Sequence, residues 1–193
     1  MILLDERTFR DDLRRYKRAD TLPHKLFYTP DYLPYTTSDS TMLGEAQWTW
    51  LGEQLQVPAD IRIIGSGTQF GIEWNGYEAW ANFPHEQQRM LELIKSSKAS
   101  GVIFISGDVH YGEISVLRSD TCYPIYDVTS SGITSTWDFA TPNANRIEGP
   151  VMDNNFGLLT ITWSEDPNIK MEIFDVHNNQ RGEYAIKLSE ISF

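Results

Sequence analysis

The chain has 193 residues, 40% of them hydrophobic and 22% charged, which is ordinary for a globular protein and suits one domain or a large part of one. Its formal net charge of −11 argues against nucleic-acid binding, because an acidic surface repels phosphate backbones. The single cysteine, Cys122, excludes an internal disulfide and any multi-cysteine zinc site, and no apolar run approaches the ~20 residues that a membrane-spanning helix needs.

The first 40 residues are predicted to form one short strand followed by irregular structure. The apolar run Ile2–Leu4 is typical of a buried strand that leads into a loop at Asp5. Residues 11–18 are highly charged and are predicted to form a surface helix or turn. Three prolines among many aromatic and small polar side chains predict a long, aromatic-packed loop over residues 21–40. Because a core strand begins at once, we expect further sequence to precede this chain in a parent protein.

The middle of the chain is predicted to alternate helices with apolar strands. Trp48, Leu51 and Leu55 recur at helical spacing, and Ser40 or Thr41 is expected to cap their helix. Continuous apolar strands that alternate with helices indicate a sheet covered on both faces. The expected elements are a helix over 43–55, a strand over 61–64, a helix over 84–98 and a strand over 102–105.

The end of the chain has a different pattern. Residues 156–163 and 169–176 alternate apolar and polar side chains, and Asp166, Pro167 and Asn168 lie between them. This arrangement predicts a β-hairpin, to which residues 183–188 would add a third strand. The fold class is therefore α/β with α+β character: a mixed sheet with a C-terminal antiparallel hairpin.

Asp108 and His110 are the main candidates for chemistry. They follow a predicted strand, and ligands of α/β sheets collect at the carboxyl ends of strands. In an extended segment, residues two apart point the same way, so a carboxylate oxygen and an imidazole nitrogen could reach one cation. The alternative is that Asp108 caps a turn and His110 is a hydrogen-bonded loop histidine.

Two further residues are weaker candidates. Arg7 follows the first predicted strand, where it could contact an anion, and Glu113 could orient His110. Both residue types more often form ordinary salt bridges. The remaining histidines, His24, His85 and His177, are expected to be surface or turn residues.

Seven stretches, in this order and spacing, resemble the C-terminal half of PhoD-type alkaline phosphatases, a family of the calcineurin-like metallophosphoesterase superfamily. They are Leu3–Arg10, Met42–Leu51, Ile64–Gln69, Glu78–Pro84, Phe104–His110, Tyr126–Gly132 and Asn155–Gly157.

The resemblance implies a fold, a reaction and a site. The fold would be part of a four-layer αββα metallophosphoesterase sandwich, with residues 1–193 as the C-terminal half of one domain. The activity would be hydrolysis of phosphate monoesters or diesters with two or more divalent or trivalent metal ions, and calcium, iron, manganese and zinc all remain open. Asp108 and His110 match the late metal-binding motif of the family, which makes them the expected metal ligands and catalytic residues. Arg7, from its position after the first predicted strand, is the expected substrate-binding residue.

The sequence departs from the family pattern in one respect. Gly107-Asp108 is its only Gly-Asp pair, and it contains no Asn-His-Asp or Asn-His-Glu segment. The family's other metal ligands precede the strand with which this chain begins. We therefore expect this chain to be inactive alone and to need a missing N-terminal half. The resemblance also implies an exported parent protein, in the periplasm or outside the cell.

A second hypothesis comes from another functional class. The chain would then be a non-catalytic, β-rich binding module that reuses the same scaffold. Its binding surface for sugar or protein would be formed by Trp48, Trp50, Trp74, Trp80 and Trp137. The burial of these tryptophans, and whether Asp108 and His110 share a pocket, discriminate between the two hypotheses.

Overall fold

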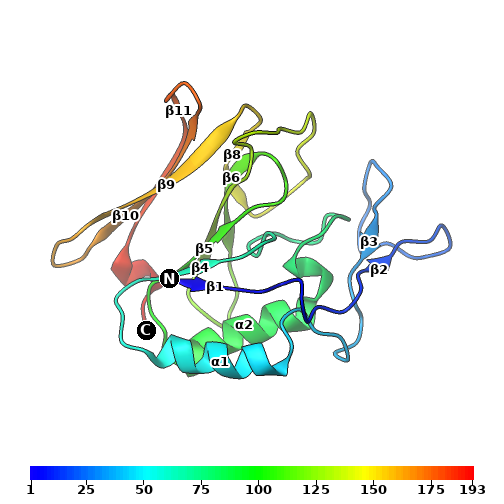
Figure 1. Cartoon of the computed structure of the whole chain (residues 1–193), viewed down its shortest axis with the longest axis horizontal. Coiled ribbons are helices and arrows are strands. Elements are labelled where there is room, and N and C mark those ends of the chain that lie inside the picture. The colour runs from blue at the N-terminus through cyan, green and yellow to red at the C-terminus, as the bar shows by residue number, and fades with distance from the viewer.

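A six-stranded mixed sheet forms the centre of the molecule (Figure 1). The structure is a computed structural model that describes residues 1–193. The strand order is β1-β4-β5-β7-β6-β8; β1, β4, β5 and β7 run parallel, and β6 and β8 are antiparallel to their neighbours. The bounds are β1 Ile2–Leu3, β4 Arg62–Gly65, β5 Val102–Ser106, β6 Gly112–Leu117, β7 Ile125–Ser130 and β8 Arg146–Val151.

Two helices cover one face of this sheet (Figure 1). They are α1, Glu45–Gln56, and α2, Pro84–Ser96, and both lie within two residues of their predicted bounds. Leu51 and Leu55 of α1 and Ile94 of α2 are fully buried in a cluster that includes sheet residues such as Phe104. The N-cap residue of α1 is Gly44, not Ser40 or Thr41 as expected. The Thr41 hydroxyl nevertheless accepts a hydrogen bond from the Gly44 N–H at 2.8 Å.

A second sheet covers the other face. It consists of β9 Asn155–Thr162, β10 Asn168–Asp175 and β11 Gln180–Lys187, all antiparallel, in the order β11-β10-β9. Its inner side chains, such as Ile169 and Ile173, pack against Ile114 and Val128 of the central sheet. The layers therefore run helices, mixed sheet, antiparallel sheet, which confirms the predicted mixed α/β fold and its C-terminal hairpin with a third strand.

Three expectations from the sequence were wrong or incomplete. Residues 11–18 form no helix: β2, Arg14–Arg15, pairs with β3, Tyr32–Leu33, and a turn begins only at the end of the stretch, where the Asp20 N–H donates to the Lys17 carbonyl oxygen at 2.8 Å. The stretch has no apolar stripe with which a helix could dock. β1 is an edge strand with an exposed Leu3, not a buried strand. The sequence pattern does not predict β6, β7 and β8: buried polar residues such as Glu113 and Asp127 interrupt the apolar pattern of β6 and β7, and β8 is mostly half-buried or exposed.

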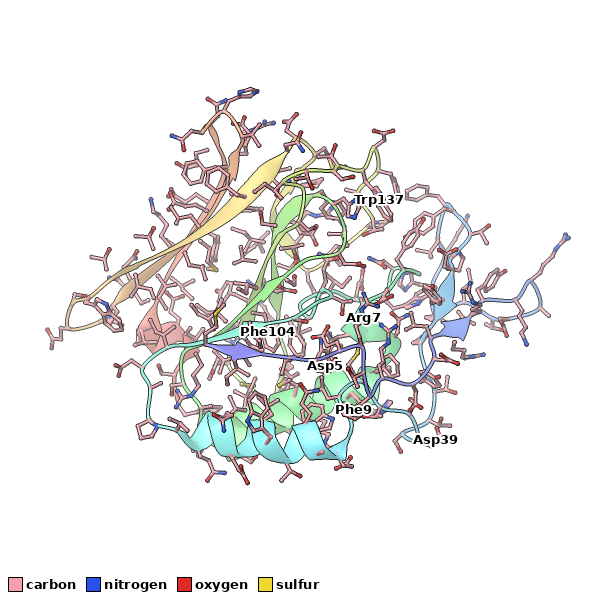
Figure 2. The ribbon with its side chains drawn as sticks, viewed as in Figure 1. Asp5, Arg7, Phe9, Asp39, Phe104 and Trp137 are labelled. Carbon is pink, nitrogen blue, oxygen red and sulfur yellow. The ribbon has the colours of Figure 1, made fainter.

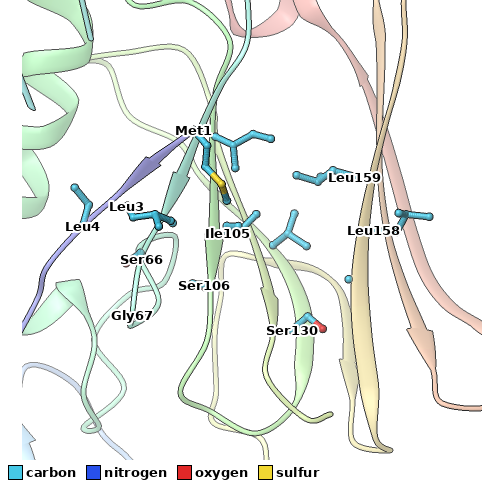
Figure 3. A pocket seen from close by; sticks show the side chains of 14 residues that line it. Met1, Leu3, Leu4, Ser66, Gly67, Ile105, Ser106, Ser130, Leu158 and Leu159 are labelled. Atoms are coloured by element: carbon cyan, nitrogen blue, oxygen red, sulfur yellow. The ribbon is translucent and has the colours of Figure 1, made fainter. Parts of the chain in front are cut away.

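A mostly apolar groove opens between the two sheets on the side where β1 and β9 lie (Figure 3). It has a volume of about 650 Å³, and Leu3, Ile105, Leu158 and Leu159 are among the side chains that line it. β1 pairs only with β4, and β9 pairs only with β10, so each strand leaves one edge without a partner. The groove is therefore flanked by two unpaired strand edges.

No helix of this structure has both the length and the apolar character required to cross a membrane.

Gly101, which precedes β5, is the position where the backbone most clearly requires glycine. Its φ is +71°, and a Cβ atom would lie 2.1 Å from the carbonyl oxygen of Asp60. We expect Gly101→Ala to lower the free energy of unfolding by roughly 2–3 kcal/mol, measured by urea denaturation. Gly52→Ala is the control: a Cβ there meets only Leu93 Cδ1 at 3.6 Å, so alanine in the middle of α1 should stabilise by about 0.5–1 kcal/mol. An equal loss in both variants would contradict the close approach at Gly101.

Candidate functional site

Three loops meet at one edge of the central sheet. The parallel register aligns Leu3 with Gly65 and Gly65 with Ile105, so β1, β4 and β5 end side by side. The loops that follow these strands contain Arg7, Thr68 and Asp108 respectively. Their convergence confirms the reasoning from the strand ends, and it gathers polar side chains that lie far apart in the sequence.

A buried carboxylate joins the first two loops. Glu6 accepts hydrogen bonds from the Ser66 hydroxyl at 2.6 Å, the Thr68 N–H at 3.0 Å and the indole N–H of Trp80 at 3.2 Å. Burial raises the pKa of Glu6, and the hydrogen bonds from Ser66, Thr68 and Trp80 oppose this effect. Glu6 carries no signal in the sequence, because a glutamate between Asp5 and Arg7 has no pattern that indicates burial.

Asp108 and His110 line one cavity of about 220 Å³. Tyr77, Glu78 and Trp137 also form its walls. The backbone between the two candidates is not extended as expected: φ is +78° at Asp108 and +57° at His110. Residues other than glycine seldom adopt such values, and they cluster at functional sites. The loop therefore brings the two side chains to one cavity through a strained turn.

The backbone of His110 is fixed from two sides. Its N–H donates to the Ser131 hydroxyl at 2.9 Å, and its carbonyl oxygen accepts from the Trp137 N–H at 3.3 Å. The ring nitrogen Nδ1 is buried and has no hydrogen-bond partner. A buried nitrogen without a partner is costly in a protein unless a ligand satisfies it. This chemistry fits a metal ligand, although it supplies only one donor.

Asp108 lies between opposite charges. Its Oδ1 is 3.9 Å from Nη2 of Arg7, and its side chain is 40% exposed. Burial raises the pKa of Asp108, the negative charge of Glu78 adds to the rise, and the positive charge of Arg7 opposes it. A cation in the cavity would favour the charged carboxylate in the same way as Arg7 does.

Arg7 is a bridge between carboxylates. Its Nη1 bonds to Oε1 of Glu78, which also accepts from Nη1 of Arg10 at 2.5 Å. The Arg7 side chain is 57% exposed, so part of its guanidinium group remains open to solvent beside the cavity. Figure 2 labels Arg7 and Trp137 on the same side of the molecule.

Glu113 does not contact His110. It is fully buried in β6, where it forms an ion pair with Arg146 and accepts hydrogen bonds from Gln69 Nε2 at 2.7 Å and Asn143 Nδ2 at 2.8 Å. Gln69 and Asn143 come from two loops that extend over the sheet, and Arg146 is the first residue of β8. Glu113 therefore supports these loops and is not among the residues that line the cavity.

The other expected candidates lie outside this cavity. His177 is exposed in the turn after β10, as predicted, whereas His85 is half-buried and its Nε2 lies 2.6 Å from the Ser40 carbonyl oxygen. Three of the five tryptophans proposed for a binding surface are buried: Trp48, Trp74 and Trp80. The proposed five-tryptophan surface does not exist, because these indoles fill the core beneath the loops.

The described residues contain no group of three or more His, Cys, Asp or Glu side chains that could hold a metal ion. Asp108 and His110 thus provide two donors at a shared cavity, but not a complete set of protein ligands.

Comparison with known proteins points to one family. The sequence model of a family described as PhoD-like phosphatase matches residues 1–191. Alkaline phosphatase D of Bacillus subtilis (strain 168) is 26% identical over 140 residues, which cover 68% of this chain and 22% of that protein. This chain therefore spans less than a quarter of that relative.

Two solved structures share the fold. A structure of PhoD superposes with a TM-score of 0.60 at 18% identity and covers 95% of this chain and 41% of its own. A purple acid phosphatase from yellow lupin seeds gives a TM-score of 0.50 at 15% identity. The match covers 83% of this chain and 32% of the lupin protein.

Asp127 of β7 provides a test of the scaffold beneath these loops. Its Oδ2 accepts hydrogen bonds from the N–H groups of Phe70 and Gly71, each at 2.8 Å, whereas the buried Oδ1 has no partner. Burial raises the pKa of Asp127 to about 6 from 3.8. The folded chain therefore holds this proton more tightly than the unfolded chain does, and the stability from this group, fully present below about pH 4, is lost as the pH rises through 6.

We expect Asp127→Asn to be more stable than the native chain above pH 6, and this advantage to shrink as the pH falls towards 4. Asparagine keeps an oxygen for both N–H groups and cannot carry the buried charge. Thermal melts across this pH range measure the difference. The exposed Asp120→Asn is the control for removal of one negative charge, and a similar pH dependence in that variant would argue against the assignment to Asp127.

Proposed function

The chain belongs to the PhoD-like phosphatase family, and we propose that it forms part of a metal-dependent hydrolase of phosphate monoesters or diesters. The observation that carries the proposal is that Asp108 and His110 line one cavity beside Arg7. A carboxylate, an imidazole and a guanidinium group together suit a cation and a phosphate.

Asp108 and His110 would hold a metal ion through a carboxylate oxygen and a ring nitrogen. Mixed oxygen and nitrogen ligands are compatible with zinc, iron, manganese or calcium, and two or more ions would be used. Such ions, when bound, polarise a phosphoryl oxygen and lower the pKa of bound water, so that a nucleophile is available at neutral pH. The buried, unpartnered Nδ1 of His110 supports this role.

Arg7 would bind a phosphate oxygen of the substrate. Only Nη1 bonds to Glu78, and Nη2 is 3.9 Å from Asp108, so the exposed guanidinium group retains N–H donors. The ion pair with Glu78 restricts the orientations that the guanidinium group can adopt. An arginine that is already oriented loses less conformational entropy when it binds an anion.

We propose that the remaining metal ligands come from a part of the protein that this chain does not span. Asp108 and His110 leave the set of donors incomplete, and the chain covers only 41% of the PhoD structure. The apolar groove is the place where such a part would pack. Its lining includes Gly67 and Ser106, which adjoin the loops of the site, so a segment bound there would lie beside Asp108.

Metal binding by the isolated chain is the first test. At tenfold excess over its dissociation constant, a bound ion would stabilise the fold by about 1.4 kcal/mol. We expect manganese, zinc, calcium or iron to raise the melting temperature. Asp108→Asn should abolish the shift, because it removes the charged carboxylate ligand. Asparagine tolerates the same positive-φ backbone conformation, so the loop should keep its fold. The control is His177→Gln in an exposed turn. If no ion shifts the melt, the two residues do not form a preformed metal site.

Catalytic activity is the second test. The isolated chain should not hydrolyse an aryl phosphate with any of these metals, because its two donors hold the ion weakly and incompletely. A colorimetric assay of nitrophenol release measures turnover. Metal-dependent turnover that His110→Ala abolishes would show that this chain is sufficient, and it would refute the need for a further part.

A further inference from the structure

A continuous strip of aromatic rings leads from the candidate site to the surface. The rings of His110 and Trp137 have their centroids 6.0 Å apart, and Trp137 lies 5.6 Å from Tyr77. Tyr77 stacks on Tyr28 at 5.6 Å. Phe139 lies 5.3 Å from Tyr28, and Phe27 lies 5.7 Å from Phe139. We call Trp137, Tyr77, Tyr28, Phe139 and Phe27 the aromatic strip.

The strip is built from three separate loops. Phe27 and Tyr28 precede β3, Tyr77 lies between β4 and α2, and Trp137 and Phe139 lie between β7 and β8. Its inner ring is structural, because the Tyr28 hydroxyl donates to the Asn75 carbonyl oxygen at 2.5 Å. Its ends are open: the exposed fraction is 77% for Phe27 and 38% for Trp137. Leaving such rings in water forgoes the favourable free energy of burial, so the exposed ends are not explained by packing.

The size of the cavity indicates what this surface binds. The cavity with Asp108 and His110 has a volume of about 220 Å³. This is below the ~300–1,000 Å³ of pockets that enclose whole organic ligands. A phosphate group fits inside, whereas an organic group attached to it must extend beyond the cavity. Trp137 and Tyr77 belong both to the wall of the cavity and to the strip, so they are the surface that such a group meets.

We propose that the aromatic strip binds the organic group of the substrate, and that this group is a flat ring, as in an aryl or nucleoside phosphate. The phosphate would face Arg7, and the ring would stack on Trp137 at the mouth of the cavity. Aromatic faces bind flat rings with little dependence on ring identity. The placement of the phosphate beside Arg7 rests on the proposed phosphatase function, whereas the binding of a ring by the strip does not depend on it.

The competing exit from the cavity is charged. A neighbouring cleft of about 610 Å³ shares Tyr32 and Glu78 with the cavity, and its positive side chains are Arg10, Arg14, Arg15 and Lys17. An organic group with further negative charge would bind there. The cleft also contains Asp12, Asp20 and Glu78, so its positive charges are largely balanced. This balance favours the aromatic strip as the surface for an uncharged ring.

The test uses phenol, which carries the ring without the phosphate, and the isolated chain in metal-free buffer. The indole N–H resonances of the 6 tryptophans are followed by ¹H–¹⁵N NMR and assigned by single substitutions to phenylalanine. We expect phenol to move the Trp137 resonance and leave that of Trp163 in place. Trp163 is the matched control, because it is 63% exposed at the far end of β9.

Affinity changes complete the test. Trp137→Ala should weaken phenol binding by about tenfold, and Trp163→Ala should not change it. Arg15→Ala should have no effect. Equal shifts at Trp137 and Trp163, or no shift at Trp137, would overturn the proposal.

The outcome is separable from that of the metal experiment. A phenol response at Trp137 in a chain that no metal stabilises would keep the ring-binding surface and remove the proposed metal site. A metal shift that depends on Asp108, without a phenol response, would keep the metal site and remove the surface.

Discussion

The carboxylate of Glu6 determines how the loops of the site are placed. It accepts hydrogen bonds from Ser66, Thr68 and Trp80, and it thereby fixes the loop after β1 against the loop after β4. Arg7 is the next residue, so its position beside Asp108 depends on this buried anchor. Burial of a carboxylate is unfavourable unless several donors compensate for lost hydration, and Glu6 has such donors. Glu6 is therefore stable in its buried position only where the ends of β1 and β4 lie side by side, because that arrangement brings its donors together.

The loop with Asp108 and His110 combines strain with fixed support. Asp108 and His110 both have positive φ values. Hydrogen bonds to the Ser131 hydroxyl and from the Trp137 N–H hold the backbone of His110 against the neighbouring loop. Such strain persists only where the surrounding structure determines the conformation, and here the buried sheet beneath supplies this constraint. The same loop connects the two proposed parts of substrate recognition, because Trp137 contacts the His110 backbone and begins the aromatic strip.

Much of the architecture could be predicted from local patterns. The periodicity of α1 and α2, the apolar strands β4 and β5 and the alternation in β9 and β10 each reflect one buried face, which a sequence records directly. The strands β6 and β7 could not be predicted in this way. Their buried Glu113 and Asp127 are compensated by partners that are distant in the sequence, such as Arg146 of β8 and Gly71 of the loop after β4, and no local pattern contains these partners.

The sequence by itself determined the class of fold and the family resemblance, and it named Asp108 and His110 as the candidate residues. Their position after a strand made them candidates, because parallel strands end at a common edge, and the resemblance then implied that they are metal ligands. Only the tertiary structure decided which groups meet them. It placed Arg7 beside Asp108, moved Glu113 away from His110, and buried three tryptophans while leaving Trp137 at the mouth of the cavity. Such contacts depend on how loops far apart in sequence pack against one another, and periodicity and spacing carry no record of that packing.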